Sequence, residues 1–260
     1  ELLQNKDLPA AEREEYLQSI NFAGKALLNL INDILDLSKL EANQVMIMPE
    51  RLDFYKLCCE IHAIFTHQAA QKQLKLELDC PDTLPLLHID GSRMRHILLN
   101  LIGNAIKFTE NGSVITRIRF RKDDGETGTL SINIIDTGIG IAKDAQKKIF
   151  EPFVQLNVVR GSRYNRGTGL GLTISKQLVE KMGGTMTLES QVSEGSNFTV
   201  VLNHVRFDEG KYAPPPEAND DGALKRHGIL IVDDVGMNLA LLSAMLQKLN
   251  QKVHTATSGE

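Results

Sequence analysis

The sequence predicts an α/β sandwich, with helices on one face of a mixed sheet, preceded by a helical bundle segment and followed by the start of a doubly wound α/β domain. Three patterns support this prediction. An apolar stripe with helical spacing covers residues 16–37, strand and helix patterns alternate from residue 44, and a buried-strand run at 228–232 follows a proline-rich stretch. We therefore divide the chain into residues 1–43, 44–206, a linker at 207–226, and 227–260.

The composition is that of an ordinary soluble protein. The chain has 260 residues, of which 42% are hydrophobic and 24% charged, and its net charge of −4 does not point to nucleic acid. The cysteines at 58, 59 and 80 lack metal-site spacing and indicate buried thiols in a reducing compartment. No run approaches the ~18 apolar residues of a membrane span. Because the chain does not begin with Met, we expect a cytoplasmic piece of a longer protein, which would contact a membrane only through other parts.

The N-terminal region carries an apolar stripe with alternating spacings of four and three residues, the heptad pattern of a helix in a coiled-coil-like bundle. Leu28, Ile31 and Leu35 widen the stripe, which favours a four-helix arrangement. The alternative is a single amphipathic helix lying on its own domain. The stripe consists of Tyr16, Ile20, Ala23, Leu27, Leu30, Ile34 and Leu37.

From residue 44 the pattern is that of short strands and helices in one α/β domain. A polar segment at 157–166, with Arg163 and Arg166, is expected to form a lid because it lies between two candidate phosphate-binding segments, although a solvated loop has the same composition. The predicted strands are 45–48, 74–78, 86–89, 114–121, 130–136, 185–189 and 197–203, and the predicted helices are 53–70, 91–108, 144–150 and 173–182.

An alternating strand ends in Asp136, which is followed by Gly138 and Gly140. Two glycines let the backbone approach a flat ligand, and a carboxylate at the strand end can accept a hydrogen bond from the ligand edge. Adenine offers such an edge, with an amine as donor. Taken alone, however, a turn of this kind more often only closes a strand.

A polar row crosses the predicted helix 91–108. Asn100, Asn104 and Lys107 are spaced i, i+4 and i+7, so they share one face while apolar neighbours serve the core. Two amides and an ammonium suit a metal-bound polyphosphate. The alternative is a solvated helix face, although Asn is a poor helix former.

Glycines also open the next helix, in the segment GTGLGL at 167–172. Such a start exposes backbone N–H groups at the positive end of the helix dipole, where an anion binds. The expected anion is a triphosphate. The glycine spacing differs from that of P-loop proteins and of the dinucleotide-binding fingerprint.

Together these segments resemble the catalytic ATP-binding domain of two-component sensor histidine kinases. Residues 100–108 are similar to the N box of that family, 136–141 and 167–172 to its two glycine boxes, and 150–153 to its F box. The resemblance covers nearly the whole chain and implies the histidine kinase/gyrase-type ATP-binding fold, with ATP and Mg²⁺ as cofactors. Residues 1–43 are similar to the C-terminal part of the dimerisation and histidine phosphotransfer hairpin, so a homodimer is implied.

The resemblance also implies roles for single residues. Asn100 would hold Mg²⁺, and Asn104 and Lys107 the phosphates. Phe108 would contact the adenine edge and Asp136 the adenine amine. The implied ATP-binding set is Asn100, Asn104, Lys107, Phe108, Asp136, Gly138, Gly140, Thr168, Gly169, Leu170 and Gly171.

The C-terminal region begins with a buried-strand run that ends in Asp233 and Asp234. Two carboxylates at the carboxyl end of a parallel strand form a hard-oxygen site for Mg²⁺, although a merely acidic strand terminus would look the same. The segment is similar to the start of a response-regulator receiver domain, with Asn238 at the family's expected position and Val235 where Asn is frequent. The aspartate that accepts phosphate is expected beyond residue 260.

The implied function is that of a hybrid sensor histidine kinase, an enzyme that transfers the γ-phosphoryl group of ATP to a histidine and on to a receiver aspartate. The receiver is either its own or that of a separate response regulator. None of the seven histidines lies in the family's phosphoacceptor context, so the accepting histidine is expected outside this chain.

Two other functions fit parts of the pattern. An ATP-driven conformational ATPase of the same superfamily, of the topoisomerase, mismatch-repair or chaperone type, would need a water-activating acid four residues before Asn100, where this chain has His96. An interaction scaffold without ATP binding is disfavoured by the intact polar and glycine segments.

Overall fold

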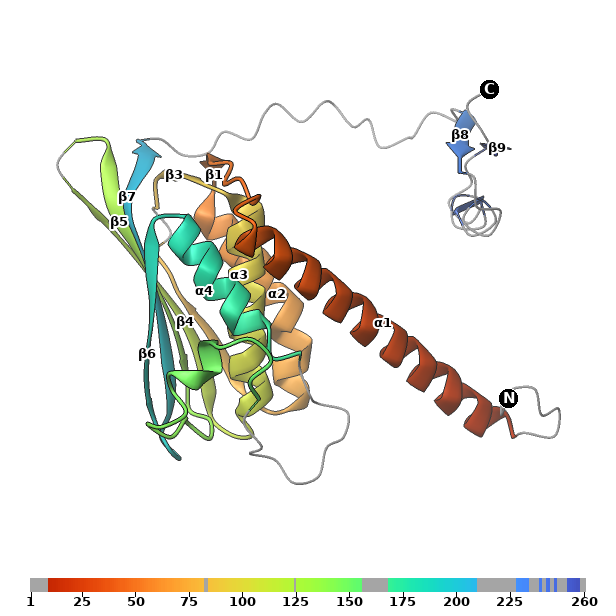
Figure 1. Ribbon diagram of the computed structural model, residues 1–260, viewed down its shortest axis with the longest axis horizontal. Helices are drawn as coiled ribbons and strands as arrows, with labels where there is room; N and C mark the ends of the chain where they lie inside the picture. Colours follow the sequence, from red (N-terminus) through yellow and green to blue (C-terminus); the bar gives the residue numbers. More distant parts are fainter. Residues whose placement is uncertain are drawn as a thin grey trace. The chain divides into compact units, whose positions relative to one another are not determined.

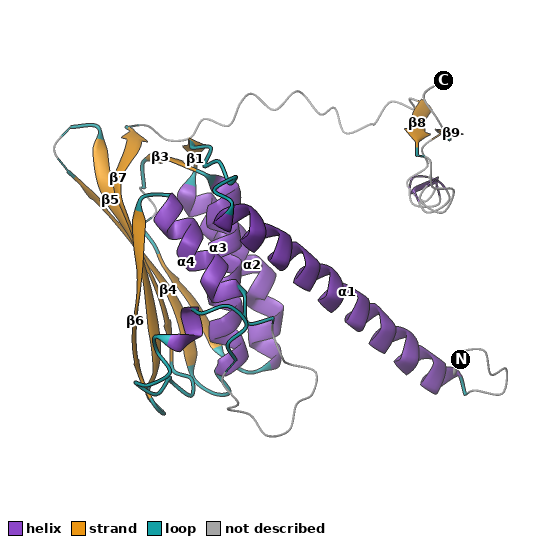
Figure 2. Cartoon of the chain, in the orientation of Figure 1, coloured by secondary structure: helices purple, strands orange, loops and turns teal. Residues whose placement is uncertain are grey.

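The computed structural model describes residues 9–81, 84–123, 125–155, 168–209, 228–233, 239, 242–243, 246 and 252–257. The chain divides into two compact units, Glu1–Lys211 and Tyr212–Glu260. The described part of the first unit holds helices and one sheet (Figure 1 and Figure 2). Its elements are α1 (Ala10–Glu41), β1 (Glu50–Leu52), α2 (Phe54–Gln71), β2 (Lys75–Asp79), β3 (Leu86–Ile89), α3 (Gly91–Phe108), β4 (Ser113–Lys122), β5 (Thr127–Asp136), the 3-10 helix η2 (Lys148–Phe150), α4 (Gly171–Lys181), β6 (Gly184–Gln191) and β7 (Gly195–Asp208).

The sheet is mixed, and its strands lie in the order β1-β3-β7-β5-β4-β2, with β6 paired to β7. Strands β2 and β4 are parallel, whereas β4, β5 and β7 are antiparallel to their neighbours in that series. Strand β7 bonds to β5 along one edge, and to β6 and then β3 along the other. Helices α2, α3 and α4 cover one face of the sheet (Figure 1), which confirms the predicted α/β sandwich.

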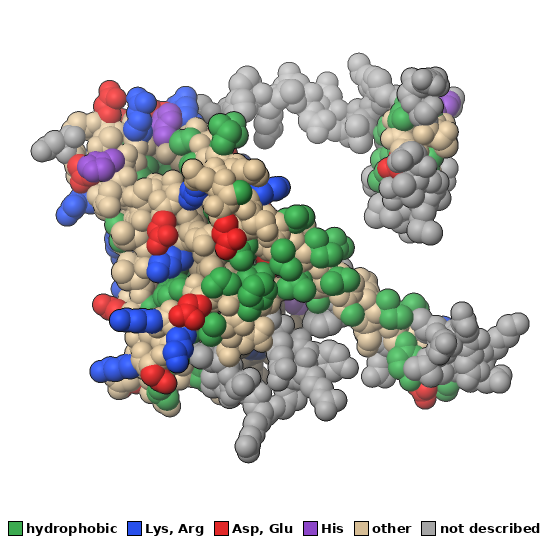
Figure 3. Space-filling model, viewed as in Figure 1, with side chains coloured by type: hydrophobic (Ala, Val, Ile, Leu, Met, Phe, Trp, Pro, Cys, Tyr) green, Lys and Arg blue, Asp and Glu red, His purple; other side chains and the backbone are tan. Residues whose placement is uncertain are grey.

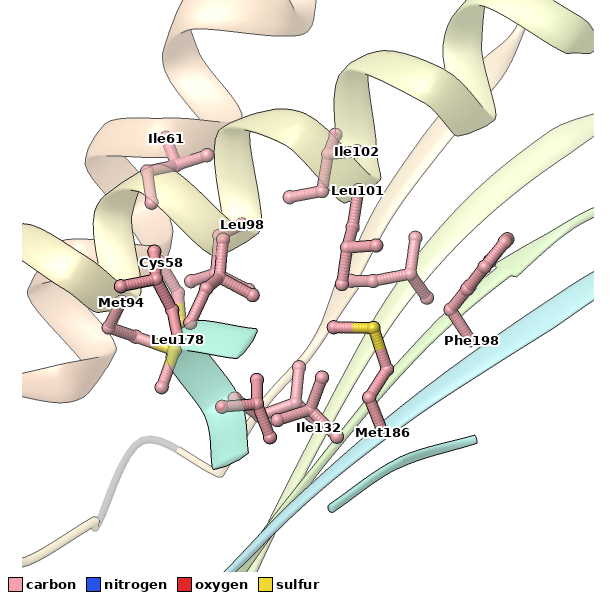
Figure 4. Close-up of a cluster of buried hydrophobic side chains, with 14 of the residues drawn as sticks. Cys58, Ile61, Met94, Leu98, Leu101, Ile102, Ile132, Leu178, Met186 and Phe198 are labelled. Carbon is pink, nitrogen blue, oxygen red and sulfur yellow. The ribbon is translucent and has the colours of Figure 1, made fainter. Parts of the chain in front are cut away.

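The core lies between these helices and the sheet. Figure 4 shows side chains of α2, α3 and α4 converging on those of the sheet, among them Leu98, Leu178 and Ile132. In β5 every second residue is buried, because side chains alternate between the two faces of a strand. Burial of one such Leu or Ile contributes about 1.5–3 kcal/mol.

Aspartates begin the two long helices of this layer. Asp53 accepts a hydrogen bond from Lys56 N–H at 2.9 Å, and Asp90 accepts one from Arg93 N–H at 3.0 Å. Each bond satisfies one of the N–H groups that a helix start leaves unpaired, which stabilises the helix by about 1 kcal/mol. The other oxygen of Asp90 accepts from Met48 N–H at 3.0 Å, so α3 is also tied to the segment that follows α1.

Two predicted elements are wrong. The first strand is β1 rather than 45–48, because Glu50–Leu52 pairs with β3 while the N–H of Met48 bonds to the Asp90 side chain. The predicted helix 144–150 consists of turns that end in η2. Here the Gln146 side-chain amide bonds to the carbonyls of Ile141 and Ser190, which anchors the segment to its surroundings.

The end of the sheet also differs from expectation. Strand β7 continues through Asp208, two residues into the range expected to be linker. Phe207 is buried and pairs with Leu87 of β3, and the side chain of Asp208 binds Arg51 at 2.7 Å and His88 at 3.1 Å. These contacts extend the strand.

Helix α1 leaves most of its apolar stripe uncovered. Ile20, Leu27 and Leu28 are exposed, and Figure 3 shows hydrophobic side chains gathered along this helix. Near its end, Leu37 and Leu40 are buried in the core of the domain. Within the described residues of one copy no bundle forms around the stripe, so the bundle stays a prediction. No helix in the described ranges has the length and apolar character needed to cross a bilayer.

In the second unit, β8 (Gly228–Val232) and β9 (Lys252–Ala256) form a parallel pair. Leu239, between them in the sequence, is buried. Asp233 follows β8, and its backbone N–H donates to the Ala256 carbonyl at 3.2 Å. A receiver domain stays a prediction, since Asp234, Val235 and Asn238 lie outside the described residues.

Candidate functional site

The predicted polar row on α3 forms a hydrogen-bonded set. The Asn104 side-chain amide donates to Asn100 Oδ1 at 3.2 Å, and that of Asn100 donates to Ser175 Oγ on α4 at 2.8 Å. Both asparagines are half-buried, because other faces of α3 fill the core. Protein contacts therefore fix the orientation of both amides.

Lys107 continues the row at the C-terminal end of α3. Its side chain is half-buried, and loss of water around the ammonium lowers the pKa of Lys107 from its usual value. The ammonium lies 5.0 Å from the ring centroid of Phe108, which is partly exposed. None of the ion pairs between described residues includes Lys107. A partly desolvated cation with no carboxylate partner among the described residues suits an anionic ligand.

Asp136 is the last residue of β5. Its side chain lies on the same face of the strand as those of Ile132 and Ile134, and this face points toward the helices. The residue is only 7% exposed, and burial raises the pKa of its carboxyl group. Gly138 N–H donates to Asp136 Oδ1 at 2.8 Å. The carboxylate therefore holds its own turn, and this turn lies beside the end of α3, since a Cβ on Gly138 would lie 2.8 Å from Asp136 Oδ1 and 2.5 Å from the Phe108 carbonyl oxygen.

Neighbouring backbone explains the two glycines after Asp136. A Cβ on Gly138 would lie 2.5 Å from the carbonyl oxygen of Phe108, and one on Gly140 would collide with that of Gln191. Gly140 also has a φ of +64°, which other residues rarely adopt. We expected these glycines to make room for a ligand. In the structure the protein itself fills the space beside both α-carbons.

In the segment before α4, neighbouring protein atoms also fill the space beside the glycines. Gly169 has a φ of +75°, and a Cβ there would lie 2.9 Å from the backbone of Phe153. A Cβ on Gly171 would collide with Oδ1 of Asn100, so the start of α4 rests on the polar row. The side chain of Leu170 is fully buried and belongs to the core, so this residue can serve a ligand only through its backbone.

The three predicted segments meet around the C-terminal half of α3. Gly171 places the start of α4 against Asn100. Ile139, in the segment that follows β5, donates its N–H to the Phe108 carbonyl at 3.3 Å. Among the described residues no side chain caps α4, whose capping position is occupied by Leu170. The first N–H groups of a helix lack partners within it and, together with the helix dipole, attract an anion.

The fourth segment, 150–153, supports the start of α4. The ring centroids of Phe150 and Phe198 lie 6.4 Å apart. The backbone carbonyl of Phe150 accepts a hydrogen bond from Thr173 Oγ1 at 2.9 Å. Phe153 is exposed, has a φ of +63°, and donates its N–H to the Gly169 carbonyl at 3.0 Å. The predicted lid at 157–166 lies outside the described residues.

Sequence reasoning missed a contact between α1 and this region. Thr168 Oγ1 donates to Asp33 Oδ2 at 2.8 Å, and Asp36 Oδ2 lies 3.9 Å from His96 Nδ1 on α3. The hydroxyl expected to serve a nucleotide is thus bonded to α1. In the sequence, Asp33 and Asp36 have the pattern of a solvated helix face, so no local signal reveals their position.

Comparison with known families agrees with this geometry. Residues 89–206 match the model described as histidine kinase-, DNA gyrase B-, and HSP90-like ATPase. The match begins in β3 and ends in β7, so it contains all the segments that meet around α3.

The similar curated proteins are sensor proteins. The chain is 36% identical over 253 residues to the aerobic respiration control sensor protein ArcB of Escherichia coli (strain K12). It is 37% identical over 262 residues to the virulence sensor protein BvgS of Bordetella bronchiseptica. These alignments cover 96% and 97% of this chain but only 32% and 21% of those proteins, so the chain spans about a third of their length or less.

Two solved structures show the same fold. ShkA full-length in complex with AMPPNP has a TM-score of 0.65 and 28% identity, covering 99% of this chain and 51% of that one. The Acinetobacter baumannii histidine kinase AdeS has a TM-score of 0.60 and 24% identity, covering 78% of this chain and 89% of that one. The likeness to AdeS supports the fold alone.

Proposed function

Residues 89–206 are the ATP-binding catalytic domain of a sensor histidine kinase, and from this premise we propose that the site around α3 binds ATP with Mg²⁺ and donates its γ-phosphoryl group to a histidine. One observation carries the proposal. An amide pair, a desolvated ammonium and an uncapped helix start meet on α3, with the buried carboxylate of Asp136 beside its C-terminal end.

The phosphate side of the site follows from what phosphoryl transfer requires, namely positioning and charge neutralisation. Asn100 supplies an oxygen ligand to Mg²⁺, an ion that prefers oxygen donors and commonly binds through few protein groups plus phosphates and water. When bound, Mg²⁺ neutralises charge on the terminal phosphates. Asn104, Lys107 and the backbone N–H groups at the start of α4 bind the phosphates themselves.

The adenine side of the site depends on burial. Asp136 accepts a hydrogen bond from the adenine amine, and the partly exposed ring of Phe108 contacts the adenine edge. Because water is excluded around Asp136, this bond is stronger than it would be at the surface. Gly138, Gly140 and Gly169 shape the site by letting its segments pack closely.

An ATPase of the gyrase or chaperone type is less well supported. Water activation would need an acid four residues before Asn100, and that position is His96. Its ring lies 3.9 Å from Asp36 of α1, a helix that precedes the matched domain. The expected position on α3 therefore carries an imidazole, and the carboxylate beside it belongs to α1 and not to the matched domain.

For the parent protein, we propose dimerisation through α1 and onward transfer to a receiver aspartate. The exposed stripe of α1 offers an apolar surface to the same surface of a second copy. Residues 227–260 would begin the protein's own receiver, with Asp233 and Asp234 as Mg²⁺ ligands, and a separate response regulator is a further acceptor. For the kinase domain we propose a location in the cytoplasm.

Calorimetry with an ATP analogue tests the binding step. The chain should bind the analogue with Mg²⁺, more weakly without Mg²⁺, and adenosine more weakly still. An analogue that fails to bind with or without Mg²⁺ would refute the proposed site.

Labelling tests the transfer step. None of the seven histidines has the phosphoacceptor context, so this chain alone should bind ATP without phosphorylating itself. After incubation with γ-labelled ATP, acid and base treatment separates phosphohistidine from phosphoaspartate. Stable label on a histidine of this chain would show that the acceptor has been misassigned.

A further inference from the structure

The last turn of α3 determines where Lys107 and Phe108 point. A helix leaves its last four carbonyl groups without partners inside the helix, and buried carbonyls need other donors. Ala105 O accepts from the N–H and the hydroxyl of Thr109, at 3.1 and 2.7 Å, and Phe108 O accepts from Ile139 N–H at 3.3 Å. The two carbonyls between them, including that of Lys107, need a donor from elsewhere.

That donor is the side chain of Lys72, at the end of α2. Its Nζ lies 2.7 Å from Ile106 O, 3.0 Å from Lys107 O and 3.3 Å from Thr109 O. An ammonium has three N–H donors, so three carbonyl oxygens match its capacity. Its charge also lies at the negative end of the α3 dipole. Lys72 therefore completes the hydrogen bonding of the helix end that carries Lys107.

The backbone of Lys72 is itself firmly held. The residue caps the C-terminus of α2, and its N–H bonds to the carbonyls of Gln68 and Ala69 at 3.3 and 3.1 Å. Gln73 then adopts a φ of +57°, and Leu74 N–H returns to Ala69 O at 2.9 Å, an arrangement that ends helices. The ammonium thus reaches α3 from a rigid point.

We propose that Lys72 is a positioning residue of the nucleotide site, which orients Lys107 by binding the carbonyls of its turn. Without this ammonium the last turn of α3 frays, and Lys107 no longer points toward the phosphates. Phe108 depends less on Lys72, because its carbonyl is bound by Ile139. This inference rests on the proposed function, since it assumes that Lys107 binds phosphate.

The substitution Lys72→Met tests the proposal because it removes the donors and keeps an apolar side chain of similar length. In calorimetry on the 260-residue chain, affinity for ATP with Mg²⁺ should fall about fivefold to tenfold, and affinity for adenosine by less than about twofold. Lys72→Arg should recover most of the loss, since a guanidinium also donates to carbonyls. The matched control is Lys75→Met, because the Lys75 side chain is 74% exposed and pairs with Glu77; this variant should bind like the unmodified chain.

A double-mutant cycle separates positioning from stability. If Lys72 acts through Lys107, then Lys72→Met should cause less than about a twofold further loss of ATP affinity in a Lys107→Met background. A cap that only stabilises the fold would lower ATP and adenosine affinity alike and would add to the loss from Lys107→Met. Ile61→Val, in the core of α2, shows what a general loss of stability does to both ligands.

The outcomes distinguish the inference from the proposed function. Unchanged ATP affinity in Lys72→Met, equal losses for both ligands, or additivity with Lys107→Met would overturn the inference and leave the nucleotide site in place. Absence of ATP binding by the unmodified chain would overturn both. If Lys72→Met does not fold, Lys72→Gln retains part of the hydrogen bonding and is judged by the same ratio of ATP to adenosine affinity.

Discussion

Helices α1 and α3 carry apolar stripes of the same kind but differ in what covers them. In α3, Met94, Leu98 and Leu101 are at most 1% exposed. In α1, Leu27 and Leu28 are 58% and 60% exposed, and hydrophobic side chains line the helix in Figure 3. The difference arises because α3 packs between other helices and the sheet of its own domain, whereas α1 packs on the domain only near its C-terminal end.

This comparison shows what helical periodicity indicates and what it omits. Spacings of three and four residues identify the apolar face of a helix, but they do not identify the surface that covers it. The core of its own domain buries the apolar face of α3 within the same chain. If α1 gains its burial from a second copy, as proposed above, its stability should depend on protein concentration.

The largest expected effect comes from matched leucines in the two helices. Leu98→Ala leaves a cavity in the core and should lower the free energy of unfolding by about 3–5 kcal/mol. Leu28→Ala should change it by less than about 0.5 kcal/mol in the monomer and weaken self-association instead. Urea denaturation and analytical ultracentrifugation measure the two effects. Equal destabilisation by both substitutions would show that the helices are covered alike.

The next effect concerns the carboxylate beside the end of α3. Asp136→Asn should weaken binding of an ATP analogue tenfold or more, because a charge-assisted hydrogen bond contributes about 1.5–3 kcal/mol. The fold should persist, since the amide oxygen of Asn can still accept a hydrogen bond from Gly138 N–H. Binding should weaken because the amide NH₂ then faces the adenine amine, and both groups are donors. Calorimetry with unchanged affinity would remove Asp136 from the site.

The same carboxylate predicts a pH dependence of adenine binding. Burial raises the pKa of Asp136, and the ionised form accepts the hydrogen bond, so affinity should fall as the pH decreases through this raised value. The free energy of unfolding should depend on pH in the opposite direction. Because the folded state favours the protonated carboxyl group, the stability that this group contributes is lost as the pH rises through its folded-state pKa. Adenosine titrations avoid protonation of the phosphates. The dependence should be absent in Asp136→Asn.

A smaller effect is expected from two glycines that receive the same methyl group. A Cβ on Gly171 would collide with the Asn100 side chain of α3, whereas a Cβ on Gly24 in α1 would have no described atom within 4 Å. Gly171→Ala should therefore weaken ATP about threefold to tenfold, and adenosine less. Gly24→Ala should stabilise α1 by about 0.5–1 kcal/mol and leave ATP affinity unchanged. Equal losses for ATP and adenosine in Gly171→Ala would place the phosphates elsewhere.

The smallest effect concerns the hydrogen bond between Asp33 of α1 and Thr168. Asp33→Asn removes the charge and should weaken this contact by about 0.5–1 kcal/mol. If Thr168 leaves Asp33 to bind nucleotide, ATP affinity should rise about twofold to fivefold. Asn32→Ala, at an exposed position next to Asp33, is the control. Unchanged affinity in Asp33→Asn would separate α1 from nucleotide binding.

The sequence predicts elements best where local chemistry decides them. Helix α3 has the predicted bounds 91–108, because Asp90 caps its start and its apolar spacing runs to Phe108. The first strand was misplaced because the pairing between β1 and β3 is a long-range choice that no local pattern reveals.

In the candidate site, too, local chemistry could be predicted from the sequence and long-range contacts could not. Its three segments were predicted from residue chemistry, and the structure brings them together. The glycines were assigned to the ligand, although backbone such as that of Phe108 fills the space beside Gly138. Lys72 and Asp33 were missed because their roles arise from contacts with residues far away in the sequence.

Strand β7 ties the order of synthesis to the closing of the sheet. It is the last strand of its unit to be made, yet it pairs with β5, β6 and β3. Until residues 195–208 have left the ribosome, β5 presents an unpaired edge, and β1 and β3 have no strand to join them to the rest of the sheet. The nascent domain therefore carries this open strand edge from the synthesis of Asp136 until that of β7, and a chain released before Gly195 would keep the edge available to other nascent chains.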